Sequence, residues 1–185
     1  MTDATGTPTV LIVDDEERVA NTYALRLGEG YDTAVALSGE DALQMVDETV
    51  DVVLLDRRMP GMSGEAVLEE IRARGLECRV VMVTAVDPGF DIAEMDIDDY
   101  VVKPIDKSEL RDVVDRALTV AEYNQQMQEL SALKLKRNVL EVELHDTELE
   151  ESETYTSLVE QIAQLESELD AMEADLDLEQ IDLFL

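Results

Sequence analysis

Residues 9–104 contain five short apolar runs, and each of them ends in polar residues. The run-and-ending pairs are Thr9–Val13 before Asp14-Asp15, Tyr31–Leu37 before Ser38-Gly39, Val52–Leu55 before Asp56, Val80–Val83 before Thr84, and Tyr100–Val102 before Lys103-Pro104. Short apolar runs that alternate with helix-like segments predict a parallel sheet with helices on both faces. The carboxyl ends of parallel strands share one edge of the sheet, so we expect these polar side chains to meet there.

The segments between the runs carry apolar residues at helical spacing. They predict helices at Asp15–Leu27, Gly39–Val46, Gly64–Ala73, a short one at Asp87–Met95, and one that begins at a cap on Asp106 or Ser108. Central runs such as Val52–Leu55 are apolar throughout, as strands buried on both faces should be. The predicted fold class is therefore α/β.

The chain is strongly acidic. Its 185 residues include 45 acidic and 14 basic side chains, for a formal charge of −31, while 45% of the residues are hydrophobic and can supply a core. Acidic residues outnumber basic ones both before and after residue 118. An even spread favours adaptation of the whole surface to concentrated salt, where charges are screened within about 3 Å. The alternative is an ordinarily acidic bacterial protein.

The composition also indicates the cellular compartment of the protein. Cys78 is the only cysteine, so no internal disulfide can form. No apolar stretch approaches the roughly 20 residues of a membrane span, and Met1–Pro8 lacks the features of a signal peptide. We expect a soluble, cytoplasmic protein without a membrane partner.

The sequence changes character after Leu118, because glycine and proline no longer occur. Residues 119–150 are helix-prone, and residues 151–157 are a polar break. A heptad seam follows, made of Leu158, Ile162, Leu165, Leu169, Met172 and Leu176, with Leu183 returning to it. These patterns predict an all-α extension of two helices. It could be an antiparallel hairpin or a dimeric coiled coil.

Three aspartates at the predicted sheet edge form a candidate metal site. Asp14, Asp15 and Asp56 together offer the oxygen ligands that Mg²⁺ prefers. Adjacent aspartates after a strand are also common helix caps, and Asp56 alone could belong to a turn. The joint occurrence of these acids with Thr84 and Lys103, each at a strand end, favours phosphoryl chemistry.

Residues 9–118 resemble the receiver domain of two-component response regulators. The matching elements are Val10–Glu16, Asp51–Asp56, Met59–Gly64, Val83–Ala85 and Tyr100–Pro104. The resemblance implies a flavodoxin-like (CheY-like) fold with strand order 2-1-3-4-5. It also implies that Asp56 is phosphorylated by a sensor histidine kinase, so that the chain catalyses only its own phosphorylation and dephosphorylation.

The resemblance also implies roles for individual residues. Asp56 would be the phosphoacceptor, and Mg²⁺ would be held by Asp15, Asp56 and the main-chain carbonyl of Arg58, with Asp14 acting mostly through water. The Lys103 ammonium would neutralise charge on the phosphoryl group, and a cis Lys103–Pro104 peptide would orient that ammonium. Thr84 and Tyr100 would be the switch residues, changing the face formed by the fourth helix, fifth strand and fifth helix.

Residues 119–185 resemble the HalX domain, a helical module found after receiver domains in haloarchaeal regulators. The matching features are Tyr123, the Leu130–Leu144 helix, the break at Tyr155 and the leucine heptads. We therefore expect a receiver domain at 1–118 and a HalX-like output domain at 119–185, which the resemblance associates with transcription regulation. A homodimer could form through the receiver face or through these C-terminal helices.

Four functions remain to be weighed. The leading hypothesis is a phosphorylation-switched response regulator whose helical module binds a partner or a second copy. The alternative is a regulator that binds DNA directly through the tail, although Lys134, Lys136 and Arg137 are its only basic cluster. A metal-dependent phosphatase is disfavoured because Arg58 stands where a second acid is expected. A receiver that has lost phosphorylation is disfavoured because every expected acid, hydroxyl and ammonium is present.

Overall fold

The computed structural model describes residues 6–175, apart from the side chains of Asp146 and Asp175. The chain divides into two compact units, one up to Thr119 and one from Val120 onward. Leu176 and Leu183, which the sequence places on the heptad seam, lie outside the described residues.

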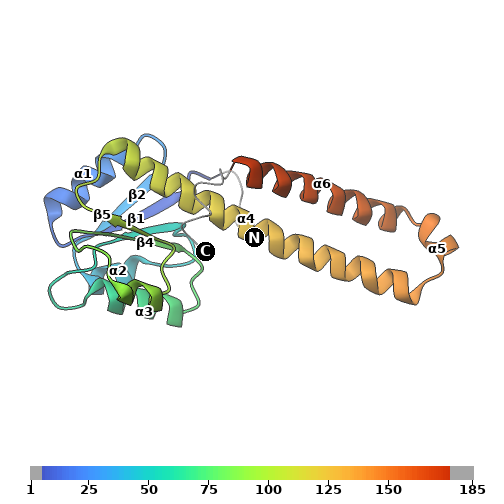
Figure 1. The fold of residues 1–185 in the computed structure, drawn as a ribbon, viewed down its shortest axis with the longest axis horizontal. Helices are drawn as coiled ribbons and strands as arrows, with labels where there is room; N and C mark the ends of the chain where they lie inside the picture. The colour runs from blue at the N-terminus through green and yellow to red at the C-terminus, as the bar shows by residue number, and fades with distance from the viewer. Residues whose placement is uncertain (1–5, 176–185) are drawn as a thin grey trace. The chain divides into compact units, whose positions relative to one another are not determined.

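The first unit is built on a five-stranded parallel sheet (Figure 1). Its strands are β1 (Thr9–Val13), β2 (Asp32–Ala36), β3 (Val52–Leu55), β4 (Arg79–Thr84) and β5 (Asp99–Val102). They are ordered β2-β1-β3-β4-β5, and every neighbouring pair is parallel. The predicted fold class and strand order are therefore confirmed. All four residues of β3 are buried, as expected for a central strand covered on both faces.

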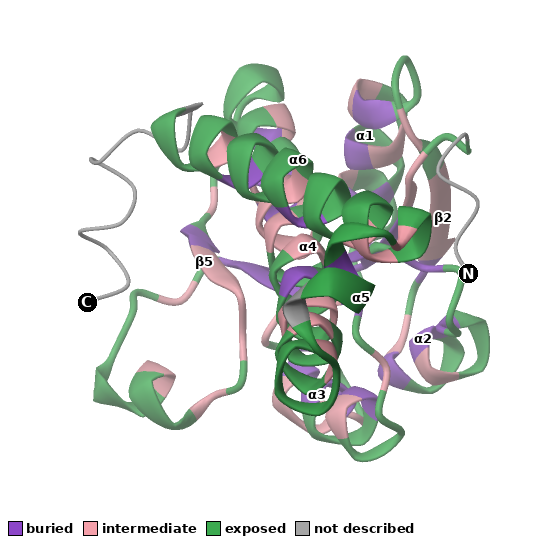
Figure 2. Cartoon of the chain, turned by 90° about the vertical axis from the view of Figure 1, so that its right-hand side faces the viewer, coloured by how far each residue is buried: buried purple, intermediate pink, exposed green. Residues whose placement is uncertain are grey.

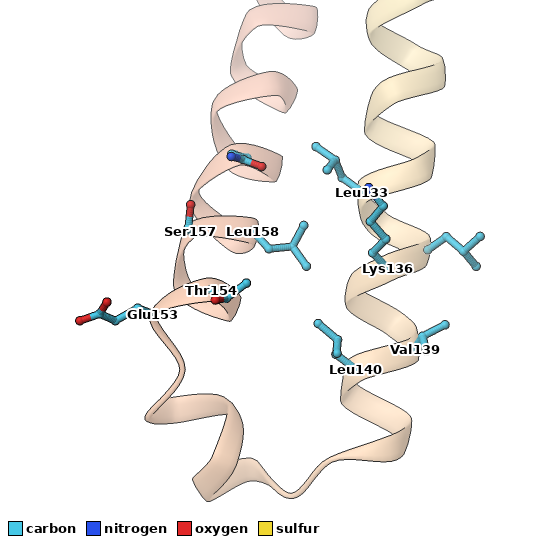
Figure 3. Close-up of a pocket in the computed structure, with 10 residues that line it drawn as sticks. Leu133, Lys136, Val139, Leu140, Glu153, Thr154, Ser157 and Leu158 are labelled. Carbon is cyan, nitrogen blue, oxygen red and sulfur yellow. The ribbon is translucent and has the colours of Figure 1, made fainter.

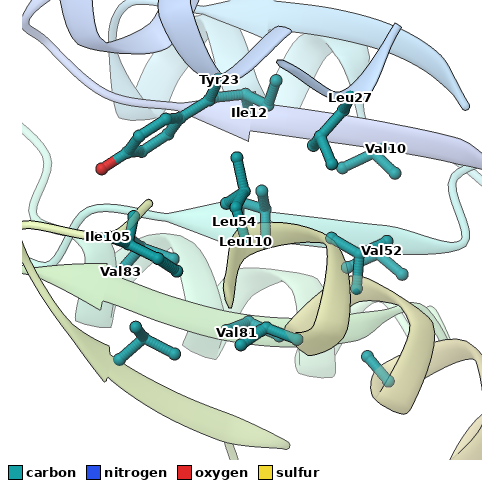
Figure 4. Packing of buried hydrophobic residues seen from close by; sticks show 14 of the residues in the cluster. Val10, Ile12, Tyr23, Leu27, Val52, Leu54, Val81, Val83, Ile105 and Leu110 are labelled. Carbon is teal, nitrogen blue, oxygen red and sulfur yellow. The ribbon is translucent and has the colours of Figure 1, made fainter. Parts of the chain in front are cut away.

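Helices cover both faces of the sheet. One core lies between the sheet and α1 (Glu17–Leu27) together with the start of α4 (Lys107–Glu143), and Figure 4 shows its packing around Ile12, Leu54 and Leu110. The other core lies against α2 (Gly39–Met45) and α3 (Gly64–Ala73). Side-chain caps fix where α2, α3 and α4 begin. The hydroxyls of Ser38 and Ser63 each accept a hydrogen bond from the backbone N–H three residues later. Asp106, rather than Ser108, caps α4, and its Oδ1 accepts a 2.9 Å bond from the Glu109 N–H.

The helix predicted at Asp87–Met95 is only a 3-10 turn, η1 (Phe90–Glu94). None of its residues is buried, so no apolar face of this segment packs against the sheet. Pro88 and Gly89 precede it and disfavour a longer helix. The prediction of an α-helix here was therefore wrong.

The second unit is a hairpin of two long helices. The part of α4 from Val120 to Glu143 runs beside α6 (Glu153–Asp175), and a short helix α5 (Asp146–Glu150) joins them. Tyr123 hydrogen-bonds Glu173 while Lys134 pairs with Glu166, so partners run in opposite directions along the two helices. Within one chain the helices thus form an antiparallel hairpin.

The hairpin core is narrow. It consists of the buried Leu130, Ile162 and Leu169, with Tyr123, Leu133, Leu158 and Leu165 packed around them. Figure 2 shows α6 mostly exposed, with buried residues confined to one stripe. The predicted break at residues 151–157 was wrong in position: the chain leaves α4 after Glu143, and α6 already begins at Glu153. Among the described residues, no helix is long and apolar enough to cross a membrane.

Candidate functional site

Three carboxylates converge at the carboxyl edge of the sheet. β1 and β3 are paired in register, with Val13 opposite Leu55, so the residues that follow them are neighbours. Carboxylate oxygens of Asp14, Asp15 and Asp56 all lie within 4.8 Å of one another. Asp14 and Asp56 are buried and Asp15 is exposed. This all-oxygen donor set, open on one side, fits a hard divalent cation such as Mg²⁺.

An ammonium group lies among these carboxylates. Lys103 follows β5, and its Nζ lies 2.6 Å from Asp14 Oδ2 and 3.0 Å from Asp56 Oδ2. Burial disfavours the charged amine, but its hydrogen bonds to both carboxylates outweigh burial and raise the pKa of Lys103 above its ordinary value. The Lys103–Pro104 peptide is cis, as expected.

Thr84 and Tyr100 are joined through one backbone position. Thr84 ends β4 and is buried, and its hydroxyl accepts a 3.3 Å bond from the backbone N–H of Val86. The Tyr100 hydroxyl donates a 2.8 Å bond to the carbonyl oxygen of the same Val86. The loop that follows β4 therefore connects the two side chains for which the sequence predicts a switch.

The loop after β3 closes tightly around Asp56. The Arg58 N–H donates to Asp56 Oδ1 at 3.4 Å, while the Arg58 side chain is exposed. Gly64 begins α3 so close to the loop that a Cβ on it would lie 2.2 Å from the Asp56 carbonyl oxygen. The absence of a side chain at Gly64 is what allows α3 to begin beside the carboxylate edge.

Sequence reasoning missed the arginine that follows Asp56. The Arg57 guanidinium forms ion pairs with Glu65 in α3, at 2.6 Å, and with Asp91 in η1. Hydrogen bonds between the guanidinium and Asp91, Tyr100 and Glu65, with Arg57 donating to both carboxylates, raise the pKa of Arg57. Adjacency to Asp56 was the only available signal, because nothing in the sequence pairs residue 57 with residue 91.

The fold and its carboxylate edge define a receiver-type α/β domain followed by a helical hairpin. A family model of the response regulator receiver domain matches residues 10–115, and a model of the HalX domain matches residues 119–184. The chain therefore belongs to the response regulator receiver family, and it carries a HalX domain after the receiver.

Individual relatives agree with this assignment. A Haloferax volcanii protein described as "putative transcriptional regulator" is 50% identical over 126 residues, which are 68% of this chain but 22% of that protein. The sensory transduction protein RegX3 of Mycobacterium tuberculosis is 44% identical over 55% of this chain and 46% of its own length. The chain thus spans less than half of the length of these relatives. The response regulator TrrA of Thermotoga maritima, solved in complex with Mg(2+)-BeF, shares 32% identity and a TM-score of 0.53 over 60% of this chain and 99% of TrrA.

Proposed function

We propose that Asp56 accepts a phosphoryl group from the phosphohistidine of a sensor histidine kinase, in a Mg²⁺-dependent reaction. The observation that carries this proposal is the grouping of Asp14, Asp15 and Asp56 within 4.8 Å of one another, with the Lys103 ammonium paired to Asp14 and Asp56. We assign the phosphoacceptor function to residues 1–118 and the output function to residues 119–185.

The chemistry follows from these side chains. An Asp56 carboxylate oxygen attacks phosphorus, an O–P bond forms, the P–N bond to the donor imidazole breaks, and the imidazole retains the electron pair. Lys103 stabilises the negative charge of the transferring group, because its ammonium already lies 3.0 Å from Asp56. Such catalysis consists mainly of positioning and electrostatics.

Asp15, Asp56 and the main-chain carbonyl of Arg58 would hold Mg²⁺, with Asp14 acting mostly through water. When bound, the ion neutralises phosphoryl oxygens. Asp14 instead accepts bonds from Lys103 Nζ and from the Glu16 N–H, at 2.6 and 2.9 Å. These contacts orient Asp14 and support an indirect role for it.

The switch that we propose begins at Thr84. Its hydroxyl would turn from the Val86 N–H to the new phosphoryl group, and Tyr100, bonded to the Val86 carbonyl, would follow the loop. Tyr100 belongs to β5, so the change would reach the face formed by η1, β5 and the start of α4. A single covalent bond would thereby bias a two-state element.

The output that we favour is binding of a protein partner or a second copy through the helical hairpin, in the service of transcription regulation. The alternative is direct DNA binding by the hairpin. It is disfavoured because the basic cluster at residues 134–137 is largely used in ion pairs within the hairpin. Lys134 pairs with Glu166 and Arg137 with Glu141, which leaves Lys136 as the one of the three without an ion pair among the described residues. One unpaired cation supplies few phosphate contacts.

Labelling by acetyl phosphate tests the proposal. We expect the full chain to gain one phosphoryl group in Mg²⁺ and none in EDTA, read by intact mass. Asp56→Asn should abolish the gain. Asp32→Asn, a substitution of an exposed aspartate at the start of β2, should leave it unchanged. Undiminished labelling of Asp56→Asn would refute the assignment, and a mobility shift of specific DNA in molar KCl would favour the alternative output.

A further inference from the structure

In the described part of the hairpin, polar bonds bridge the two long helices on one side but not on the other. On one side, Lys134 bridges to Glu166 at 2.7 Å, and the Tyr155 hydroxyl bonds Glu141 at 2.7 Å. On the other side lies an open groove of about 870 Å³, which no ion pair among the described residues crosses. That volume is within the range of about 300–1,000 Å³ typical of binding sites.

The floor of this groove is apolar. Leu133 and Leu140 of α4 and Leu158 of α6 line it, and Figure 3 shows all three pointing into the space between the helices. The wall on α6 is made of the short polar side chains Thr154 and Ser157, with Glu153 and Gln161. Short side chains on that wall leave the floor accessible.

An exposed aliphatic ridge adjoins the groove on α4. Leu135, Val139 and Val142 follow one another at spacings of four and three residues, so they share one face of the helix. Their exposed fractions are 65%, 54% and 81%. Val139 points away from α6 in Figure 3, and Leu135 and Val139 also line the outer wall of the groove. The hairpin itself therefore leaves the ridge uncovered.

We propose that this side of the hairpin binds a second copy of the same chain, with the Leu135–Val139–Val142 ridge of each copy seated in the groove of the other. Leu135 and Val139 border the groove, so a two-fold axis beside α4 allows the ridge of each copy to reach the groove of the other, and an isologous interface uses the same patch twice in this way. Among the described residues, the hairpin core contains three buried side chains, Leu130, Ile162 and Leu169. A second hairpin would complete a four-helix bundle, the usual way in which helix pairs bury such stripes.

Charge sets the conditions under which the copies associate. The hairpin is highly acidic, so two copies repel each other in dilute buffer and associate when salt screens that repulsion. Lys136 lines the groove next to the ridge and lies where it can meet the acidic surface of the second copy. This surface lies wholly within the second unit, so the dimer does not depend on phosphorylation chemistry at Asp56.

Sedimentation equilibrium of the full chain in molar KCl tests the proposal. We expect a reversible dimer whose dissociation constant rises at least about tenfold in Val139→Glu and again in Val142→Glu, as for residues at the centre of an interface. Both side chains are more than half exposed, so helicity by circular dichroism should stay unchanged. Lowering the KCl concentration should weaken the wild-type dimer.

The matched control is Val159→Glu. Val159 lies on α6 next to Tyr155, on the side closed by polar bonds, and is 38% exposed. We expect its dimer to match the wild type. A wild-type chain that stays monomeric in molar KCl would overturn the proposal and assign the groove to another partner. Dimers that survive Val139→Glu and Val142→Glu would overturn it too, by placing the interface elsewhere.

Discussion

The Lys103 ammonium lies 2.6 Å from an Asp14 carboxylate oxygen, although the two residues are 89 positions apart in the sequence. The same nitrogen lies 3.0 Å from Asp56. Lys103 thus ties the ends of three strands together while it faces the proposed phosphoacceptor. A cation held by two buried carboxylates stays charged and stays in place, which is what stabilising a phosphoryl group requires.

Lys103→Ala should therefore slow phosphorylation of Asp56 by acetyl phosphate about 100-fold, the usual cost of losing one preorganised charge at a reacting group. The rate would be followed by intact mass in saturating Mg²⁺. Lys107→Ala is the control, because Lys107 is half exposed and its one ion pair among the described residues is with the exposed Glu29. Equal rates for the two variants would show that Lys103 plays no part in the transfer.

Arg57→Lys should loosen η1 without unfolding the receiver. Arg57 spans Glu65 and Asp91 with a planar, forked guanidinium, and an ammonium cannot reproduce that geometry. Hydrogen exchange at residues 90–94 should accelerate while exchange in the central strands stays the same. Arg58→Lys, at the exposed neighbour, should leave η1 protected; similar acceleration in both variants would contradict a specific role for Arg57.

Tyr31 provides a test at alkaline pH. Burial and its hydrogen bond to Asp115 raise the pKa of Tyr31 from 10.0 to about 12. The protonated phenol therefore stabilises the fold fully below pH 10, and this contribution is lost as the pH rises from 10 to about 12. In a pH titration followed by tyrosinate absorbance, the step near pH 12 should disappear in Tyr31→Phe. Loss of a titration near pH 10 instead would show that Tyr31 is unperturbed.

Salt should stabilise the chain. With a formal charge of −31, self-repulsion disfavours the compact state, and molar KCl screens it. We expect the Tm to fall progressively as KCl is lowered from molar concentration to about 0.1 M, where the screening length is about 10 Å. A Tm independent of salt would remove the basis for the halophilic interpretation.

The sheet and the residues at its edge could be predicted because their signals are local. Each strand is a short apolar run, and parallel pairing brings the ends of β1 and β3 together, so the convergence of Asp14 and Asp56 follows from strand order alone. The cap at Ser38 was predictable for the same reason, since it depends on residues three positions apart.

The errors arose where distant contacts decide the structure. Within residues 87–95 only the 3-10 turn Phe90–Glu94 forms. Pro88 and Gly89 disfavour a longer helix, and the turn pairs with Arg57 through Asp91, a contact that local pattern does not reveal. The heptad seam identified Leu158 and Ile162 as inward-facing, but periodicity does not say which helix they face. The antiparallel partner became evident only from pairs such as Lys134 with Glu166.

Gly64 has one more consequence. Since any Cβ there would lie 2.2 Å from the Asp56 carbonyl oxygen, even alanine would push the backbone of the loop after β3 out of position. In a saturation library selected for signalling, position 64 should tolerate no other amino acid, whereas Gly30, with open space around it, should accept many. A site that carries no functional group would then rank among the least replaceable in the protein.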